Sequence, residues 1–166
     1  MSVFKNIQSS LDRFYLQTFR EVAVRRAPYD QVRRHHQVVL NFAHSLKTIP
    51  APLRESCLHN LEERFLATVA GTERAFYGPL SDGDLALVQR LRADRTEIEN
   101  EFRTLNGATE GFSERAAALE GKLKAFFALE ETELFYRAVD RFPVPQGPEI
   151  LSAYLNGANE PLRQSA

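Results

Sequence analysis

Polar side chains interrupt the apolar stripes of four predicted helices, at positions where the spacing calls for a buried residue. His36, Arg95 and Glu130 each break such a stripe, and so does the pair Thr68 and Thr72. All of them lie near the middle of their helices. In helical bundles, side chains that project inward at a shared level build the ligand and metal sites. We therefore expect these residues to form one polar cluster inside the protein.

The charges in this cluster need partners. A buried charge that is left unpaired costs several kcal/mol, so an inward guanidinium or carboxylate must find its opposite. We expect Arg95 to pair with Glu130 or Glu131 and to lie near His36, with Glu73 completing the cluster. The alternative is that the apolar stripes drift along these long helices and turn the polar residues toward solvent.

Other recognisable chemistry is missing from the sequence. Cys57 is the single cysteine, so it can form neither an intrachain disulfide nor a cysteine-based zinc site. The sequence has no glycine-rich phosphate loop, serine nucleophile elbow or His-Glu metalloprotease motif. We therefore expect no enzymatic activity, and we place the protein in the reducing cytoplasm.

The charge balance argues against two classes of partner. The formal net charge is −1, so the chain lacks the basic surface that nucleic acids or anionic membranes attract. Polar residues also break up the apolar residues near the start of the sequence, which predicts neither a signal peptide nor a membrane span. We expect the partner to be a protein.

Apolar residues recur at helical spacing throughout the chain, with Pro and Gly between the periodic stretches. We expect Pro28 to end the first helix, Asp30 to cap the second, and Gly78-Pro79 to end the third before Ser81 caps the fourth. The predicted helices run from about residue 2 to 26, 30 to 48, 53 to 77, 82 to 105, 113 to 141 and 149 to 155.

Short connections between long amphipathic helices predict an all-α fold, an antiparallel up-down four-helix bundle. The bundle would span residues 28–142, preceded by an amphipathic helix at 1–27 and followed at 143–166 by a proline-rich turn, a short helix and a flexible tail. The N-terminal helix has more aromatic residues than one bundle flank needs. We expect it to form a homodimer interface that includes Phe4, Tyr15 and Phe19.

Four short motifs between Val32 and Arg141 are distributed over two pairs of predicted helices. His36 and Val39 form an H-x-x-V motif in the first helix of one pair, and Ala75–Leu80 (AFYGPL) closes the second with aromatic residues and a proline. The other pair contains Asp94–Ile98 (DRTEI) and Leu129–Tyr136 (LEETELFY). These motifs resemble those of the hemerythrin-like family, in which the last two read E-H-x-x-I and E-E-x-x-L-F-P. The resemblance implies a cation-binding four-helix bundle.

The resemblance also implies that the metal has been lost. A di-iron centre of this family uses several imidazoles and carboxylates, spaced one turn apart on facing helices. Only His36 and the carboxylates near Glu130 match that set. We therefore expect no cofactor, and we expect the Arg95 guanidinium to take the place of the metal. The positions of missing ligands carry Thr68, Thr72, Arg95 and Phe126.

The sequence thus predicts a non-enzymatic binding or regulatory protein built on a hemerythrin-like bundle without its di-iron site. One alternative is a metal- or oxygen-responsive protein with an iron site rearranged around His36, Glu130 and Glu131. Thr72 or Glu73 would contribute to that site. A second alternative is a helical interaction subunit unrelated to hemerythrins, which is favoured if the inward polar residues do not converge.

Overall fold

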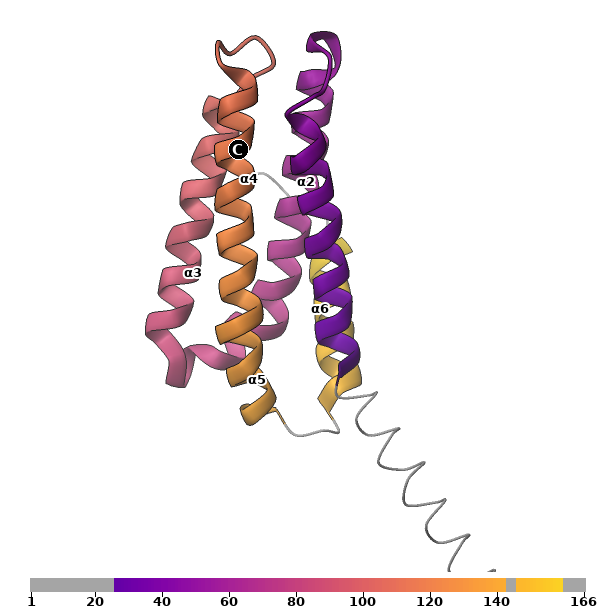
Figure 1. Ribbon diagram of the computed structural model, residues 1–166. Helices are drawn as coiled ribbons and strands as arrows, with labels where there is room; N and C mark the ends of the chain where they lie inside the picture. The colour runs from indigo at the N-terminus through magenta and orange to yellow at the C-terminus, as the bar shows by residue number, and fades with distance from the viewer. Residues whose placement is uncertain (1–25, 143–145, 160–166) are drawn as a thin grey trace, which may run out of the picture.

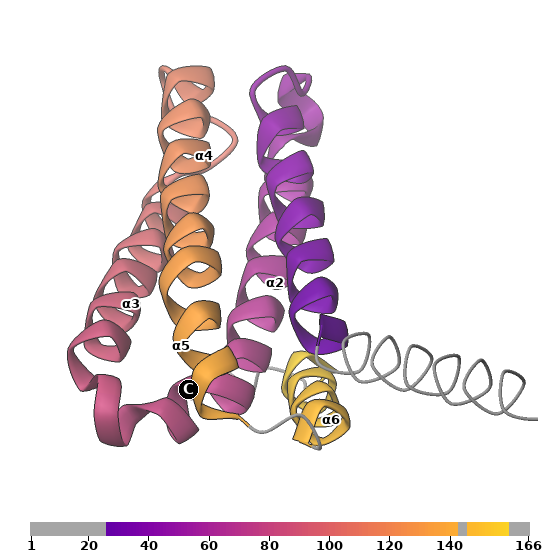
Figure 2. The same cartoon turned by 60° about the horizontal axis from the view of Figure 1, so that its bottom comes forward.

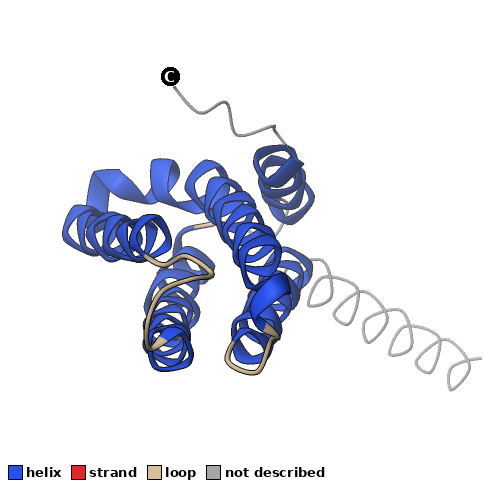
Figure 3. Cartoon of the chain, turned by 90° about the horizontal axis from the view of Figure 1, so that it is seen from above, coloured by secondary structure: helices blue, strands red, loops and turns tan. Residues whose placement is uncertain are grey.

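A computed structural model describes residues 26–142 and 146–159, and across these residues every regular element is a helix, with no strand (Figures 1 and 3). The predicted all-α class is confirmed. No described helix combines the length and the apolar character that crossing a bilayer requires. The elements are a helix at 26–46, η1 (Ala51–Leu53), α2 (Arg54–Thr72), η2 (Glu73–Tyr77), α3 (Gly78–Thr104), α4 (Phe112–Leu129), η3 (Glu130–Leu134), α5 (Phe135–Arg141) and α6 (Gly147–Asn159).

The long helices lie alongside one another (Figures 1 and 2). The 26–46 helix runs beside α2, and α3 packs against α4. Two of the elements are π-helical: η2 joins α2 to α3, and η3 joins α4 to α5. The short helix α6, yellow in Figure 1, packs against α2 next to the first half of the 26–46 helix.

Aromatic side chains from different helices fill the core. The Phe65 ring of α2 lies 5.7 Å from Phe102 of α3 and 5.8 Å from Phe126 of α4, measured between ring centroids. Closer to the other end, Tyr29 lies 5.3 Å from Phe135. All of these residues are buried. Each buried aromatic contributes about 1.5–3 kcal/mol through loss of contact with water, so the helices are held by one shared core.

The predicted start of the second helix near Asp30 is wrong, because the described chain is already helical at residue 26. Residues 26–46 form one continuous helix, and Asp30, which we expected to cap a new helix, lies within it. Asp30 instead forms an ion pair with Arg33, in which Oδ1 and Nη1 lie 3.5 Å apart. The residues that follow the proline, Tyr29 and Val32, are 6% and 0% exposed. Their burial favours the helical conformation of this stretch.

The predicted end at Gly78-Pro79 is also wrong. Helical hydrogen bonding continues from η2 into α3, and the chain bends at Asp84, the residue of α3 with non-helical angles (φ −126°, ψ 35°). Ser81 does not act as a cap, because its hydroxyl donates to the Gly78 carbonyl at 2.7 Å. Arg137 forms an ion pair with the Asp84 carboxylate. The bend is therefore held by a contact far away in the sequence, which local turn signals cannot reveal.

Helix α6 is longer than predicted, since it spans Gly147–Asn159 and includes residues expected to belong to a flexible tail. Gly157 explains the difference. A Cβ atom added there would lie 2.7 Å from the Ala70 carbonyl oxygen and 3.0 Å from the Gly71 Cα, too close for any side chain. Gly157 is thus the point of close contact between α6 and α2. The predicted N-terminal helix before residue 26 and the tail from residue 160 lie outside the described residues.

Candidate functional site

His36 points from the 26–46 helix into the core and is only 1% exposed. Its Nδ1 lies 2.8 Å from Oε1 of Glu131, in a hydrogen bond, and its Nε2 lies 3.0 Å from Oε2 of Glu130. The imidazole stacks on Phe127, with ring centroids 4.0 Å apart and planes inclined by 14°. The ring is therefore fixed between two carboxylates and an aromatic face.

Glu130 lies at the centre of this arrangement and is 0% exposed. Its Oε1 accepts a hydrogen bond of 2.6 Å from the hydroxyl of Tyr77, which is also 0% exposed. Its Oε2 faces His36 at ion-pair distance, but the two atoms do not meet with hydrogen-bond geometry. One buried carboxylate thus connects an imidazole on one side with a phenol on the other. We refer to His36, Tyr77, Glu130 and Glu131 as the central cluster.

Both π-helical segments contribute to the central cluster. Tyr77 is the last residue of η2, and Glu130 is the first residue of η3. A π-helical turn accommodates an extra residue in a helix and is frequent at functional sites. Periodicity analysis assumes regular α-helix, so it could not reveal these segments. The sequence analysis assigned Tyr77 no role, although a buried tyrosine hydroxyl needs a hydrogen-bond partner.

Burial and the neighbouring carboxylates shift the pKa of His36 in opposite directions. Burial lowers the pKa of the imidazole, but the carboxylates of Glu130 and Glu131 outweigh it and hold this pKa above its ordinary value. The hydrogen bond from His36 lowers the pKa of Glu131. Burial and the nearby Glu130 raise the pKa of Tyr77, so the phenol stays protonated and donates. The favoured state has a cationic imidazole between the two carboxylates.

Arg95 does not join the central cluster, and its predicted pairing with Glu130 or Glu131 is wrong. The guanidinium Nε donates to Glu99 Oε1 at 2.6 Å, on the same helix, and the side chain is 29% exposed. A carboxylate one turn away is already in place, whereas reaching Glu130 would require burial of the guanidinium. Within the described residues, the ion pairs of Glu131 are with His36 and Arg33.

The other predicted residues divide between the core and the surface. Thr68 and Thr72 are 3% and 0% exposed, and their hydroxyls donate to the carbonyls of Arg64 and Thr68, at 2.8 and 3.0 Å. Both hydroxyls are therefore satisfied within α2. Glu73 turns toward α3, where it forms an ion pair with Arg92. It lies outside the central cluster.

The central cluster does not fit a di-iron centre. Among residues 26–142 and 146–159, no three His, Cys, Asp or Glu side chains gather as a metal site would require. Phe126, at one of the expected ligand positions, packs against Phe65 in the core. The threonines direct their hydroxyls to backbone carbonyls, and Arg95 is a cation. A di-iron centre needs more imidazole and carboxylate ligands than remain here.

Phe4, Tyr15 and Phe19, the residues of the predicted homodimer interface, lie outside the described part of the chain. The interface therefore stays a prediction. Comparison of the chain with known protein families, curated proteins and solved structures gives no match.

Proposed function

We propose that this chain is a non-enzymatic binding or regulatory protein. Its fold would be an antiparallel up-down bundle that resembles a hemerythrin-like domain without its di-iron site. One observation carries the proposal: the buried carboxylate of Glu130 is engaged by Tyr77 on one oxygen and faces His36 with the other. The protein would act in the cytoplasm on a protein partner and would dimerise through the helix at 1–27.

The chemistry of the central cluster supports a structural role for these polar residues. A buried carboxylate is costly unless donors and a positive charge surround it. The phenol supplies a donor and the imidazolium supplies the charge, so the two together do what we expected of Arg95. His36, Tyr77 and Glu130 are each at most 1% exposed. Their burial favours a binding role over catalysis.

Metal analysis of the purified full-length protein tests this proposal. The protein would be incubated with iron(II), manganese(II) or zinc(II) under reducing conditions, passed through a desalting column and measured by plasma mass spectrometry. We expect far less than one metal per chain. The His36→Ala variant is the control for binding elsewhere. One equivalent of metal in the wild type that is lost in this variant would overturn the proposal.

One observation favours the second candidate, a metal- or oxygen-responsive protein with a rearranged site. His36 Nε2 and Glu130 Oε2 are buried, lie 3.0 Å apart and have no hydrogen-bond partner. Two ligands of one metal, each about 2.1 Å from the ion and at right angles, are also about 3 Å apart. Glu131 would have to rotate to supply a third ligand. The same metal analysis, followed by a search for an iron-oxo absorbance band, decides between the two candidates.

The positions of Arg95 and Glu73 favour a third candidate, a helical interaction subunit of separate ancestry. Both were expected in the centre, and each pairs elsewhere, with Glu99 and Arg92. This candidate also predicts a protein without metal. It differs from the first only in ancestry, so both give the same result in the metal analysis.

A further inference from the structure

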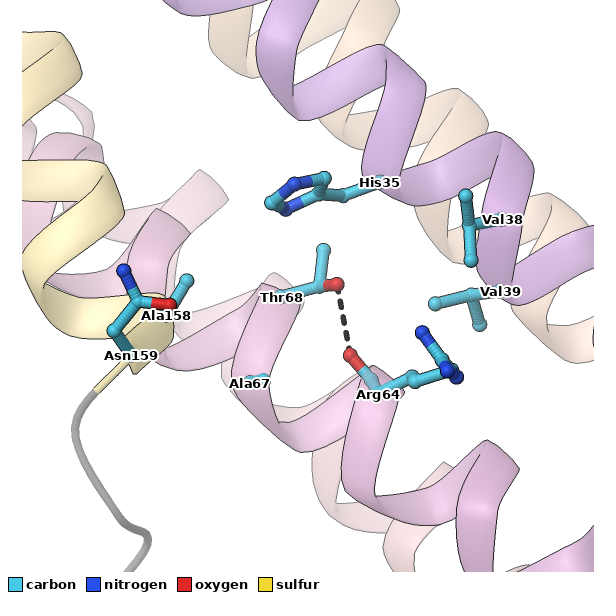
Figure 4. A pocket seen from close by; sticks show the side chains of 8 residues that line it. All are labelled: His35, Val38, Val39, Arg64, Ala67, Thr68, Ala158 and Asn159. Atoms are coloured by element: carbon cyan, nitrogen blue, oxygen red, sulfur yellow. Dashed lines mark hydrogen bonds between the residues drawn. The ribbon is translucent and has the colours of Figure 1, made fainter.

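The groove between the 26–46 helix and α2 is filled along only part of its length. α6 covers the first part, where its Tyr154 hydroxyl lies 2.7 Å from Nδ1 of His35 and its backbone touches α2 at Gly71. Beyond Asn159, the last described residue of α6, the described residues leave a pocket between the two helices. We call this stretch the open groove, and it begins as the pocket shown in Figure 4.

That pocket has a volume of about 270 Å³ and mixed walls. Val38 and Val39 of the 26–46 helix form one side, Arg64 and Ala67 of α2 form the other, and Asn159 stands at the end (Figure 4). Further along the same two helices lies a second pocket of about 230 Å³, lined by Asn41, Phe42, Ser45, Leu46, Ile49 and Cys57. The open groove therefore includes two pockets along the same pair of helices.

Two features indicate what the open groove accepts. Val38 and Phe42 are 39% and 37% exposed, one turn apart on the same face, so an apolar surface faces solvent there. Arg64 lines the first pocket, and its guanidinium lies 4.6 Å from the centre of the ring of Phe42, which lines the second. No carboxylate within the described residues forms an ion pair with Arg64. An occupant with both an acidic and an apolar side chain matches this surface.

We infer that residues 160–166 of the same chain occupy the open groove, with Glu160 against Arg64 and Leu162 against Val38. The segment, EPLRQSA, follows directly from Asn159, which lines the pocket. Pro161 disfavours continuation of α6 and favours an extended chain. In an extended chain Glu160 and Leu162 project to the same side. The binding surface of the protein would then be covered by its own chain.

The lengths agree with this placement. Seven extended residues reach at most about 25 Å. Along α2, the eleven residues from Thr68 back to Cys57 rise about 16 Å. The segment is therefore long enough to pass both pockets. The inference is independent of the metal question, because His36 faces the core and the groove lies on the side of His35.

Disulfide trapping in the full chain tests the inference. In a Cys57→Ser background, Val38→Cys is combined with Leu162→Cys, and the control combines Leu162→Cys with Leu85→Cys, since Leu85 is 52% exposed on α3. A disulfide needs Cα atoms about 4.4–6.8 Å apart. Under mild oxidation we expect rapid intrachain cross-linking of the first pair and much slower cross-linking of the control. Equal rates, or a cross-link between two chains, would overturn the inference.

Charge reversal gives a second, independent measurement. Arg64→Glu and Glu160→Arg should each slow the cross-linking of residues 38 and 162 by up to about fivefold, as expected for a partly exposed ion pair. The double reversal should restore the rate. If the single variants leave the rate unchanged, or the double variant fails to restore it, the placement of Glu160 against Arg64 is wrong. Val38, Arg64 and Leu85 are exposed and Cys57 is half-buried, so the variants should fold.

Discussion

The hydroxyl of Tyr77 can be removed almost without changing the shape of the core, which makes Tyr77→Phe a direct test of the central cluster. The hydroxyl donates a 2.6 Å hydrogen bond to Glu130, and both residues are 0% exposed. A hydrogen bond to a charged group contributes about 1.5–3 kcal/mol to stability. Its loss also leaves a buried carboxylate oxygen without a partner, so we expect the upper part of that range.

Urea unfolding followed by circular dichroism measures this loss. The matched control is Tyr136→Phe, which removes the same atom from a side chain that is 68% exposed and should change the stability by less than about 0.5 kcal/mol. Combining Tyr77→Phe with Glu130→Gln should lower the free energy of unfolding by less than the sum of the two separate losses, because both changes remove the same hydrogen bond. Equal effects of Tyr77→Phe and Tyr136→Phe would refute our account of the central cluster.

Three further predictions concern pH, close packing and assembly. Because the folded protein raises the pKa of His36 above 6.5 and lowers that of Glu131 below 4.5, the contribution of these two residues to stability should be greatest between pH 4.5 and 6.5. His36→Gln should remove the part of the alkaline loss of stability that comes from His36, measured by urea unfolding, whereas the exposed His59→Gln should leave it unchanged. Gly157→Ala should lower the free energy of unfolding by about 1–3 kcal/mol, because the added methyl group pushes α6 away from α2. The control is Gly121→Ala, where a Cβ meets nothing within 4 Å and should stabilise α4 by about 0.5–1 kcal/mol. Comparable losses of stability in both variants would show that the contact between α6 and α2 is not the cause. Serine at Phe4, Tyr15 and Phe19 together should convert a dimer to a monomer in light scattering, and a wild type that is monomeric at high concentration would end the dimer hypothesis.

Much of the fold follows from regular helical spacing. The apolar stripes place His36 and Glu130 on inward faces, and both are buried. Helix ends were harder to predict where distant residues decide them. Pro28 and Gly78-Pro79 are strong local stop signals, yet both lie within described helix. The chain bends instead at Asp84, where the distant Arg137 forms an ion pair.

The partners of the charged residues could not be predicted from spacing. Arg95 interrupts its stripe as expected, but it is half-buried and reaches Glu99 on its own helix. Which carboxylate a long side chain reaches depends on the cost of burying it, and that is a property of the packed helices. Tyr77 was missed for a related reason. Its ring suits the core, and only its hydroxyl signals that a polar partner lies opposite.

The two π-helical segments each accommodate one residue more than a regular α-helix would, and they do so next to the polar residues of the central cluster. A π turn is the form in which an α-helix absorbs one additional residue while the turns before and after it keep their contacts. Deletion of one residue from 130–134 would let α4 and α5 join as regular α-helix, with Leu123 and Ala138 still in the core. If the deleted residue is Glu130, the carboxylate that meets Tyr77 is lost with it. A single-residue loss could thus erase the polar centre of this protein and leave its helical scaffold standing.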